Sequence, residues 1–154
     1  MMQIEEKLAE LGIVLPDSAK PAAMYVPTVV TGSLCFVSGQ IPTGPDGLIT
    51  GKAGDDCSVE DAQAAARLCA INILAALKNE LGDLSLVTRI VKLQAFVNSA
   101  PGFCQQHLVA NGASQLLFDV FGEKGRHART AVGVSELPMN ALVEVEAIVE
   151  FSAQ

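Results

Sequence analysis

The sequence predicts one two-layer α+β domain, in which two helices cover one face of a mixed sheet. Three observations support this fold class. The length of 154 residues suits a single hydrophobic core. The predicted elements run as two or three strands, a helix, a strand, a second helix and two strands. Apolar residues alternate along the last strand, which indicates that one sheet face lies beneath the helices.

A short helix and a connector precede the predicted core. Residues 2–12 predict an amphipathic helix, because apolar side chains recur on one of its faces. Residues 13–23 contain two prolines and predict a connector. We therefore treat residues 1–154 as a single domain, with the helix and connector at 1–20 and the core at 21–154.

Two strands open the core, over residues 26–31 and 34–38. The dipeptide Gly32-Ser33 between them predicts a two-residue hairpin. Residues 43–47 have the composition of a turn, and residues 48–50 predict a short edge strand.

Two long helices flank the next predicted strand. The first helix covers residues 58–81, where Ser58 is a suitable N-cap and Asp61 follows at the spacing of a capping box. The second helix covers residues 105–121, and a glycine follows each helix as the expected stop. The strand between them covers residues 88–97, which include a β-branched pair.

The two final strands are predicted over residues 129–134 and 142–151. One face of the last strand is apolar and faces the helices: Val143, Val145, Ala147, Val149 and Phe151. The other face mixes apolar and acidic side chains: Leu142, Glu144, Glu146, Ile148 and Glu150. This mixture indicates a face that another subunit covers, with carboxylates in or beside an interface cleft. The alternative is an exposed face with scattered apolar residues.

The charge balance argues against nucleic acid as a partner. The chain has 17 acidic and 10 basic residues and a net charge of −7. Its one basic cluster is Lys124, Arg126, His127 and Arg129, which is too small for a phosphate backbone but large enough for one small anion.

Several patterns are missing from the sequence. We find no secretory signal, and the two long uncharged runs are interrupted by Pro, Gly, Gln and Asn, so we expect no membrane span. Metal-ligand spacings and phosphate-binding glycine loops are absent, so we expect no metal and no organic cofactor. The four cysteines lack C-x-x-C spacing and indicate a reduced, cytoplasmic protein.

Two cysteines are weak candidates for chemistry. Cys104 and His107 lie three residues apart near the start of the second helix, where an imidazole and the helix terminus would activate a thiol. The alternative is a chance spacing, with Cys104 packed as a small hydrophobe. Cys57 also precedes a helix and is a candidate reactive surface thiol.

Arg129 is the strongest candidate for ligand binding. In a strand, Arg129, Ala131 and Gly133 point to the same face, so the arginine has only small neighbours. An open space with a planar, two-pronged donor at its wall suits a carboxylate. The alternative is a structural ion pair with Glu144 or Glu146 on the next strand.

Two motifs together resemble a known family. Residues 38–42 (SGQIP) are similar to one signature of the YjgF-like, or Rid, proteins, named for the deamination of reactive imines and enamines. Residues 129–134, Leu137-Pro138 and residues 143–147 (VEVEA) resemble that family's second signature. The resemblance covers about residues 21–151. The extra N-terminal helix resembles a longer branch that often carries the name endoribonuclease.

The resemblance implies a fold and a site. The implied fold is similar to trimeric chorismate mutase, with two helices on one sheet face and the other faces lining a three-fold barrel. Arg129 would bind the substrate carboxylate, and Glu144 would lie near the attacking water. The other implied cleft positions are Tyr25, Gly39, Gln40, Phe103, Asn111 and Ala131. Ala131 departs from the deaminating members, which have Cys or Ser there.

Three functions follow from these observations. The first is hydrolysis of 2-imino or enamine acids to 2-keto acids and ammonia, in a cleft between the subunits of a homotrimer. The second is a non-catalytic trimer that binds a small carboxylate or a partner, and Ala131 favours it. The third is an endoribonuclease, against which the acidic charge argues, because metal-free RNA cleavage needs a grip on phosphate.

Overall fold

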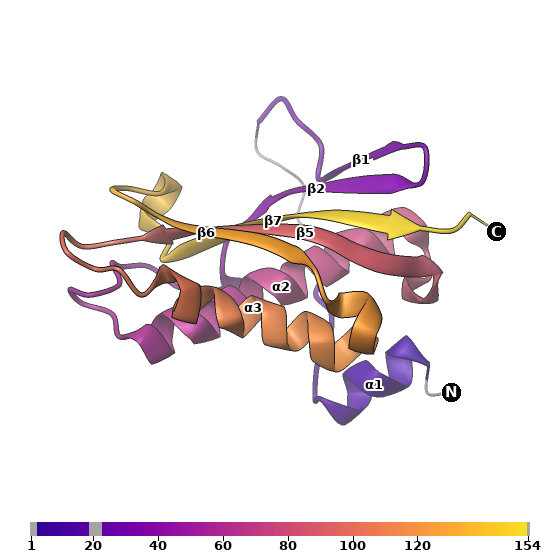
Figure 1. The fold of residues 1–154 in the computed structure, drawn as a ribbon, viewed down its shortest axis with the longest axis horizontal. Helices are drawn as coiled ribbons and strands as arrows, with labels where there is room; N and C mark the ends of the chain where they lie inside the picture. Colours follow the sequence, from indigo (N-terminus) through magenta and orange to yellow (C-terminus); the bar gives the residue numbers. More distant parts are fainter. Residues whose placement is uncertain (1–2, 19–22, 154) are drawn as a thin grey trace.

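Three α-helices lie on one side of a five-stranded sheet in the computed structural model, which describes residues 3–18 and 23–153 (Figure 1). The helices are α1 (Ile4–Glu10), α2 (Val59–Leu81) and α3 (Gln106–Phe121). The strands are β1 (Thr28–Thr31), β2 (Leu34–Gln40), β5 (Val87–Asn98), β6 (Ala128–Val134) and β7 (Val143–Phe151). The predicted two-layer α+β architecture is confirmed.

The sheet is mixed, and its strand order is β1-β2-β7-β5-β6. β5 and β6 are parallel and α3 connects them, whereas the other neighbouring strands are antiparallel. β6 is therefore an edge strand that lies beside α3, while β7 occupies the centre (Figure 1).

The predicted start of α2 is confirmed in its atomic detail. The Asp61 N–H donates to Ser58 Oγ over 3.1 Å, and the Ser58 N–H donates to Asp61 Oδ2 over 2.9 Å. This capping box satisfies two backbone donors that a helix start otherwise leaves without partners. Gly82 ends the helix as its C-cap with φ 79°, a conformation that favours glycine.

α2 and α3 approach each other closely at Gly112. A methyl group at this position would overlap the backbone carbonyl of Gln63 on α2. Beside this contact, Gln63 Nε2 donates to the carbonyl oxygen of Leu108 over 2.8 Å. The two helices therefore form one rigid layer, and the small residue at Gly112 sets its spacing.

The two faces of β7 have the predicted character. Val143, Val145, Ala147 and Val149 are buried beneath the helices. Leu142 is an exception to the prediction, because it lies just before β7 and is fully buried in the core. Its N–H donates to the Ile49 carbonyl, so a covering loop holds it away from the open sheet face.

Several predicted boundaries need correction. The short edge strand predicted at residues 48–50 is wrong: Gly47–Leu48 (β4) pairs instead with Thr43–Gly44 (β3) in a separate two-stranded hairpin. The first strand begins at Thr28 rather than Val26, and the first helix is shorter at both ends. Residues 19–22 of the predicted connector lie outside the described residues.

Short 3₁₀ turns connect the longer elements: η1 (Leu84–Leu86), η2 (Gly122–Gly125) and η3 (Pro138–Asn140). Of these, η2 carries the chain from α3 into β6 and fixes where that strand begins. Gly125 is buried against α3, where a methyl group would overlap the Leu117 carbonyl.

Candidate functional site

Arg129 points from β6 toward the helix layer. The register pairs Arg129 with Leu93 of β5, and Leu93 with Ala147 of β7. Leu93 and Ala147 are both buried under the helices, and cross-strand partners share a sheet face. The predicted common face of Arg129 and its small neighbours is confirmed, since a Cβ on Gly133 would meet Gln106 of α3.

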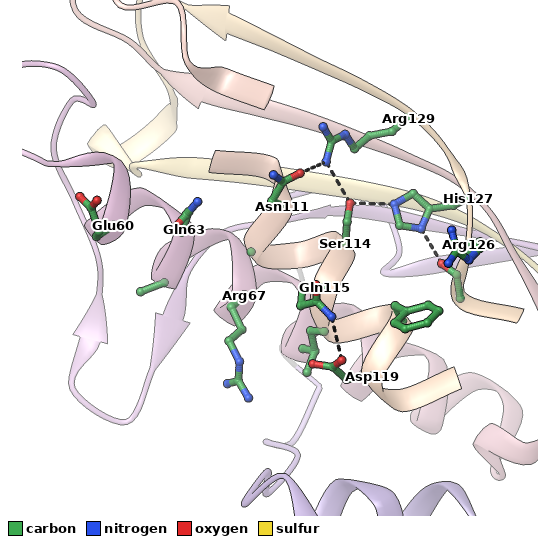
Figure 2. Close-up of a pocket in the computed structure, with 15 residues that line it drawn as sticks. Glu60, Gln63, Arg67, Asn111, Ser114, Gln115, Asp119, Arg126, His127 and Arg129 are labelled. Atoms are coloured by element: carbon green, nitrogen blue, oxygen red, sulfur yellow. Dashed lines mark hydrogen bonds between the residues drawn. The ribbon is translucent and has the colours of Figure 1, made fainter. Parts of the chain in front are cut away.

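Three hydrogen bonds tie the Arg129 guanidinium to α3, and Figure 2 shows the two to Asn111 and Ser114. Nη1 donates to Asn111 Oδ1 over 2.8 Å and to Ser114 Oγ over 3.2 Å. Nη2 donates to the backbone carbonyl of His107 over 3.1 Å. A guanidinium has five N–H groups, so the Nε–H and one Nη2–H have no acceptor among the described residues and are open to a ligand. These two donors on neighbouring nitrogens suit a carboxylate.

Arg129 lines a pocket of about 1,010 Å³ between α2, α3 and β6. Three of the four arginines in this acidic chain line it: Arg67, Arg126 and Arg129. Arg126 is partly engaged, because its Nε donates to Glu123 over 3.1 Å and its guanidinium stacks on Phe118. Arg67 points away from Arg129 (Figure 2). Arg129 is therefore the cation best placed for a small anion.

Glu144 lies on the opposite face of the sheet from Arg129. Phe96 of β5 pairs with both Glu144 and Val132, which places Glu144 on the open face, away from the helices. β5 also separates β6 from β7. The alternative of an ion pair between Arg129 and Glu144 or Glu146 is therefore wrong, and the arginine bonds to α3 instead.

Glu144 and Gly39 meet on the open face. β2 has a register irregularity between Val37 and Gln40, and a methyl group on Gly39 would overlap Glu144 Oε1. Glu144 is half-buried; burial and then the neighbouring charge of Glu146 raise its pKa. Its carboxyl thus keeps its proton to a higher pH than an ordinary glutamic acid, which suits a group that exchanges protons.

The raised pKa of Glu144 predicts a stability effect. The folded state holds this proton above the pH at which the unfolded state releases it, so the free energy of unfolding falls as pH rises through that window. We expect Glu144→Gln to melt at a higher temperature than the wild type at pH 7, and at a nearly equal temperature at about pH 3, where Glu144 is protonated in the folded and the unfolded state. Thermal melts against pH measure this difference, with Glu150→Gln as a control on the same strand. A lower melting temperature for Glu144→Gln at pH 7 would contradict the effect.

A second pocket of about 840 Å³ contains three other predicted positions: Tyr25, Gly39 and Gln40. Its walls also include residues 12–18 of the connector and Asn72 of α2, whose Nδ2 donates to the Ile41 and Thr43 carbonyls. The structure thus brings Arg129 and Asn111 together in one place and Tyr25, Gly39 and Gln40 in another.

The last two predicted positions lie outside both pockets. Phe103 packs against Gly54, and Ala131 is half-buried on β6, two residues after Arg129. Ser114 and His127, by contrast, line the Arg129 pocket. Ser114 was not predicted as a ligand-binding residue, and His127 was predicted only as a member of the basic cluster. The signal for Ser114 was its position three residues after Asn111, which puts both on one helix face.

The expected activation of the two candidate cysteines finds no support among the described residues. No hydrogen bond joins Cys104 to His107 within the part of the chain that the structure describes. Burial raises the pKa of the Cys57 thiol, and the nearby carboxylate of Asp56 adds to this effect. A raised pKa leaves less of the reactive thiolate at neutral pH.

Two further findings concern residues 3–18 and 23–153 only. No group of three or more His, Cys, Asp or Glu side chains there is arranged to hold a metal ion. None of the helices there combines the length and the apolar character that crossing a membrane requires.

Comparison with known proteins identifies the family. Residues 5–151 match the family described as "YjgF/chorismate mutase-like, putative endoribonuclease". The chain belongs to this family. The match covers nearly the whole domain, including α1, so the resemblance of the two motifs and the expected chorismate-mutase-like fold are both confirmed.

Three similar proteins illustrate the range of similarity. The protein TCP17 of Trypanosoma cruzi is 49% identical over 97% of this chain and 95% of its own length. The crystal structure of the protein Atu1372 of unknown function from Agrobacterium tumefaciens has a TM-score of 0.91 and 52% identity, covering 97% of this chain and 92% of that one. The 2-iminobutanoate/2-iminopropanoate deaminase of Salmonella typhimurium is 34% identical over 83% of this chain and 89% of its own length.

Proposed function

We propose that the protein binds 2-imino acids through Arg129 and hydrolyses them to 2-keto acids and ammonia. The observation that carries this proposal is the half-buried guanidinium of Arg129, held by α3 with two donors left for a carboxylate. The Salmonella relative, whose name describes deamination of 2-iminobutanoate and 2-iminopropanoate, supports the same substrate class.

The reaction needs orientation and proton transfer. Water adds to the carbon of the protonated C=N bond and gives a carbinolamine, which loses ammonia as the C=O bond forms. Arg129 would fix the substrate through its carboxylate, so that the imine carbon has one orientation. Glu144 would accept the proton of the attacking water and return it to the leaving nitrogen, a role that its raised pKa favours.

A site with both residues requires two copies of the chain. Arg129 and Glu144 lie on opposite sheet faces, with β5 between their strands. We therefore extend the proposal to a homotrimer with the site in the cleft between subunits. The open face supports this, because Val29, Phe36 and Val132 are exposed there. Light scattering behind a sizing column should give about three times the monomer mass; a monomer would contradict the assembly.

A complementation experiment tests the shared site. We expect the wild type to release ammonia from freshly generated 2-iminopropionate, and Arg129→Ala and Glu144→Gln each to lose this activity. Mixed trimers of the two variants, formed by co-expression, should regain up to about a quarter of wild-type turnover if neighbouring protomers supply the two residues. No recovery would mean that the two residues do not act across the interface.

A non-catalytic trimer that binds a small carboxylate is the second candidate. Ala131 favours it, because it replaces the Cys or Ser expected two residues after the arginine. Saturable pyruvate binding without turnover of any imine would support this candidate, and Ala131→Ser then tests whether a hydroxyl restores activity. Endoribonuclease activity is the weakest candidate for a chain with net charge −7. Four free cysteines suit a reducing compartment, and we propose a cytoplasmic location.

A further inference from the structure

The hydrogen bonds of Arg129 continue beyond α3 into a chain that ends on η2 (Figure 2). Ser114 Oγ, which accepts from Arg129, lies 2.8 Å from His127 Nε2. The other imidazole nitrogen, Nδ1, lies 2.6 Å from the carbonyl oxygen of Gly125. Gly125 is buried against α3, so this last acceptor is held in place.

The chemistry of these groups fixes the direction of the chain. The Gly125 carbonyl only accepts, so Nδ1 of His127 carries a hydrogen. In neutral histidine Nε2 is then an acceptor, and it receives the hydroxyl proton of Ser114. The Ser114 oxygen in turn accepts from Nη1 of Arg129. Every donor points one way, from the guanidinium to the backbone carbonyl.

We propose that Ser114 and His127 are positioning residues for Arg129, and that the carboxylate ligand of Arg129 and a proton on His127 bind cooperatively. This inference rests on the proposed carboxylate site. It concerns Ser114 and His127, which lie outside both family signatures. α3 and the turn η2 bring these two side chains within hydrogen-bond distance.

The charges around His127 determine whether its protonation strengthens or weakens carboxylate binding. Burial lowers the pKa of His127 most; the Gly125 carbonyl opposes this, and the positive charge of Arg129 lowers the pKa further. A carboxylate bound to Arg129 would neutralise that charge and raise the pKa of His127. Because coupling between two ligands is reciprocal, carboxylate affinity should rise as the pH falls through this pKa.

Other charged groups line the same pocket as His127 or lie near it along the chain and in the sheet. They are Glu60 and Arg67 on α2, Asp119 on α3, Glu123, Lys124 and Arg126 on or after η2, and Lys92 beside Ala128 on β5. Asp119 already accepts from Gln115, and Arg126 pairs with Glu123. Arg129 is the one charged residue joined to His127 through a shared hydrogen-bond partner among the described residues.

NMR titration of the imidazoles tests the coupling directly. The chain has only two histidines, so the His127 signals are readily assigned. We expect saturating pyruvate to raise the pKa of His127 by about 0.5 to 1. Pyruvate affinity should then increase about three- to tenfold from pH 8 to pH 5.

Two variants separate positioning from protonation. Ser114→Ala breaks the chain and should weaken pyruvate binding about three- to tenfold at pH 8. His127→Gln keeps an acceptor for Ser114 but does not titrate, so its affinity at pH 8 should be near wild type and its increase at pH 5 absent. Ser85→Ala, an exposed serine on η1, is the matched control.

The outcomes distinguish this inference from the proposed function. Wild-type protein that shows no saturable response to pyruvate contradicts the carboxylate site itself. Pyruvate binding that neither moves the His127 titration nor responds to Ser114→Ala overturns the coupling alone. Arg129→Gln provides a test without ligand: it should raise the pKa of His127, and an unchanged titration there overturns the coupling as well.

Discussion

Arg129→Ala is expected to lower carboxylate affinity about ten- to a hundredfold, because a charge-assisted, two-pronged contact contributes about 1.5–3 kcal/mol. Arg129→Lys should lose nearly as much, since an ammonium lacks the planar fork. Isothermal titration with pyruvate measures both losses. Because the arginine also ties β6 to α3, we expect Arg129→Ala to reduce the free energy of unfolding by about 1–3 kcal/mol.

Arg89→Ala is the matched control for this experiment. Arg89 is the one arginine of the chain outside the pocket, and it is exposed on β5. Its removal changes the net charge as Arg129→Ala does, and should change neither affinity nor stability measurably. Equal losses in the two variants would mean that general charge attracts the ligand, and a large fall in melting temperature with unchanged binding would make Arg129 purely structural.

Gly112→Ala is expected to destabilise the protein by about 1–3 kcal/mol, the usual effect of forcing an extra methyl group into a packed interface. The new Cβ would overlap the Gln63 carbonyl, so α2 and α3 would have to separate. The direction of the stability change is informative, because replacing glycine by alanine within an unhindered helix stabilises a protein by about 0.5–1 kcal/mol. Denaturant unfolding measures this change in the free energy of unfolding.

Gln115→Ala on the same helix controls for local helix propensity. Gln115 is exposed, and its replacement should change the free energy of unfolding by less than about 0.5 kcal/mol. Gly112 also lies between Asn111 and Ser114, so the separation of the helices should weaken the hydrogen bonds that these two residues accept from Arg129. A higher stability of the Gly112→Ala protein would mean that the interface between the two helices has space for the added methyl group.

The sequence pattern was sufficient for the layers of this fold, because the strongest local signals coincide with its largest elements. The capping pair Ser58 and Asp61 marked the start of α2, and the alternation in β7 marked its buried face. The weaker signal at residues 48–50 failed because other pairings compete for this segment. Residues 48–50 are compatible with an edge strand, but the β3–β4 hairpin and a loop contact near Ala141 engage this segment instead.

The direction of the Arg129 side chain was predictable from the sequence, but the arrangement of the candidate site was not. Strand register alone placed Arg129 among small neighbours. The separation of Arg129 and Glu144 was beyond the sequence pattern, because it depends on β5 lying between β6 and β7 and on the opposite facing of the two side chains. Ser114 and its contact with His127 were missed for a similar reason, since the contact depends on how the turn η2 returns the chain to α3.

The central place of β7 has a consequence for how the protein is made. β7 comes after all the other strands of its sheet along the chain, yet it joins β2 to β5, and Cys35 pairs with Val149. Before residues 143–151 are synthesised, β2 and β5 have no partner strand along the edges that β7 later joins. Such edges pair readily with other chains, and closing contacts this far apart is slow. Until β7 emerges, these unpaired edges therefore leave the nascent chain open to aggregation.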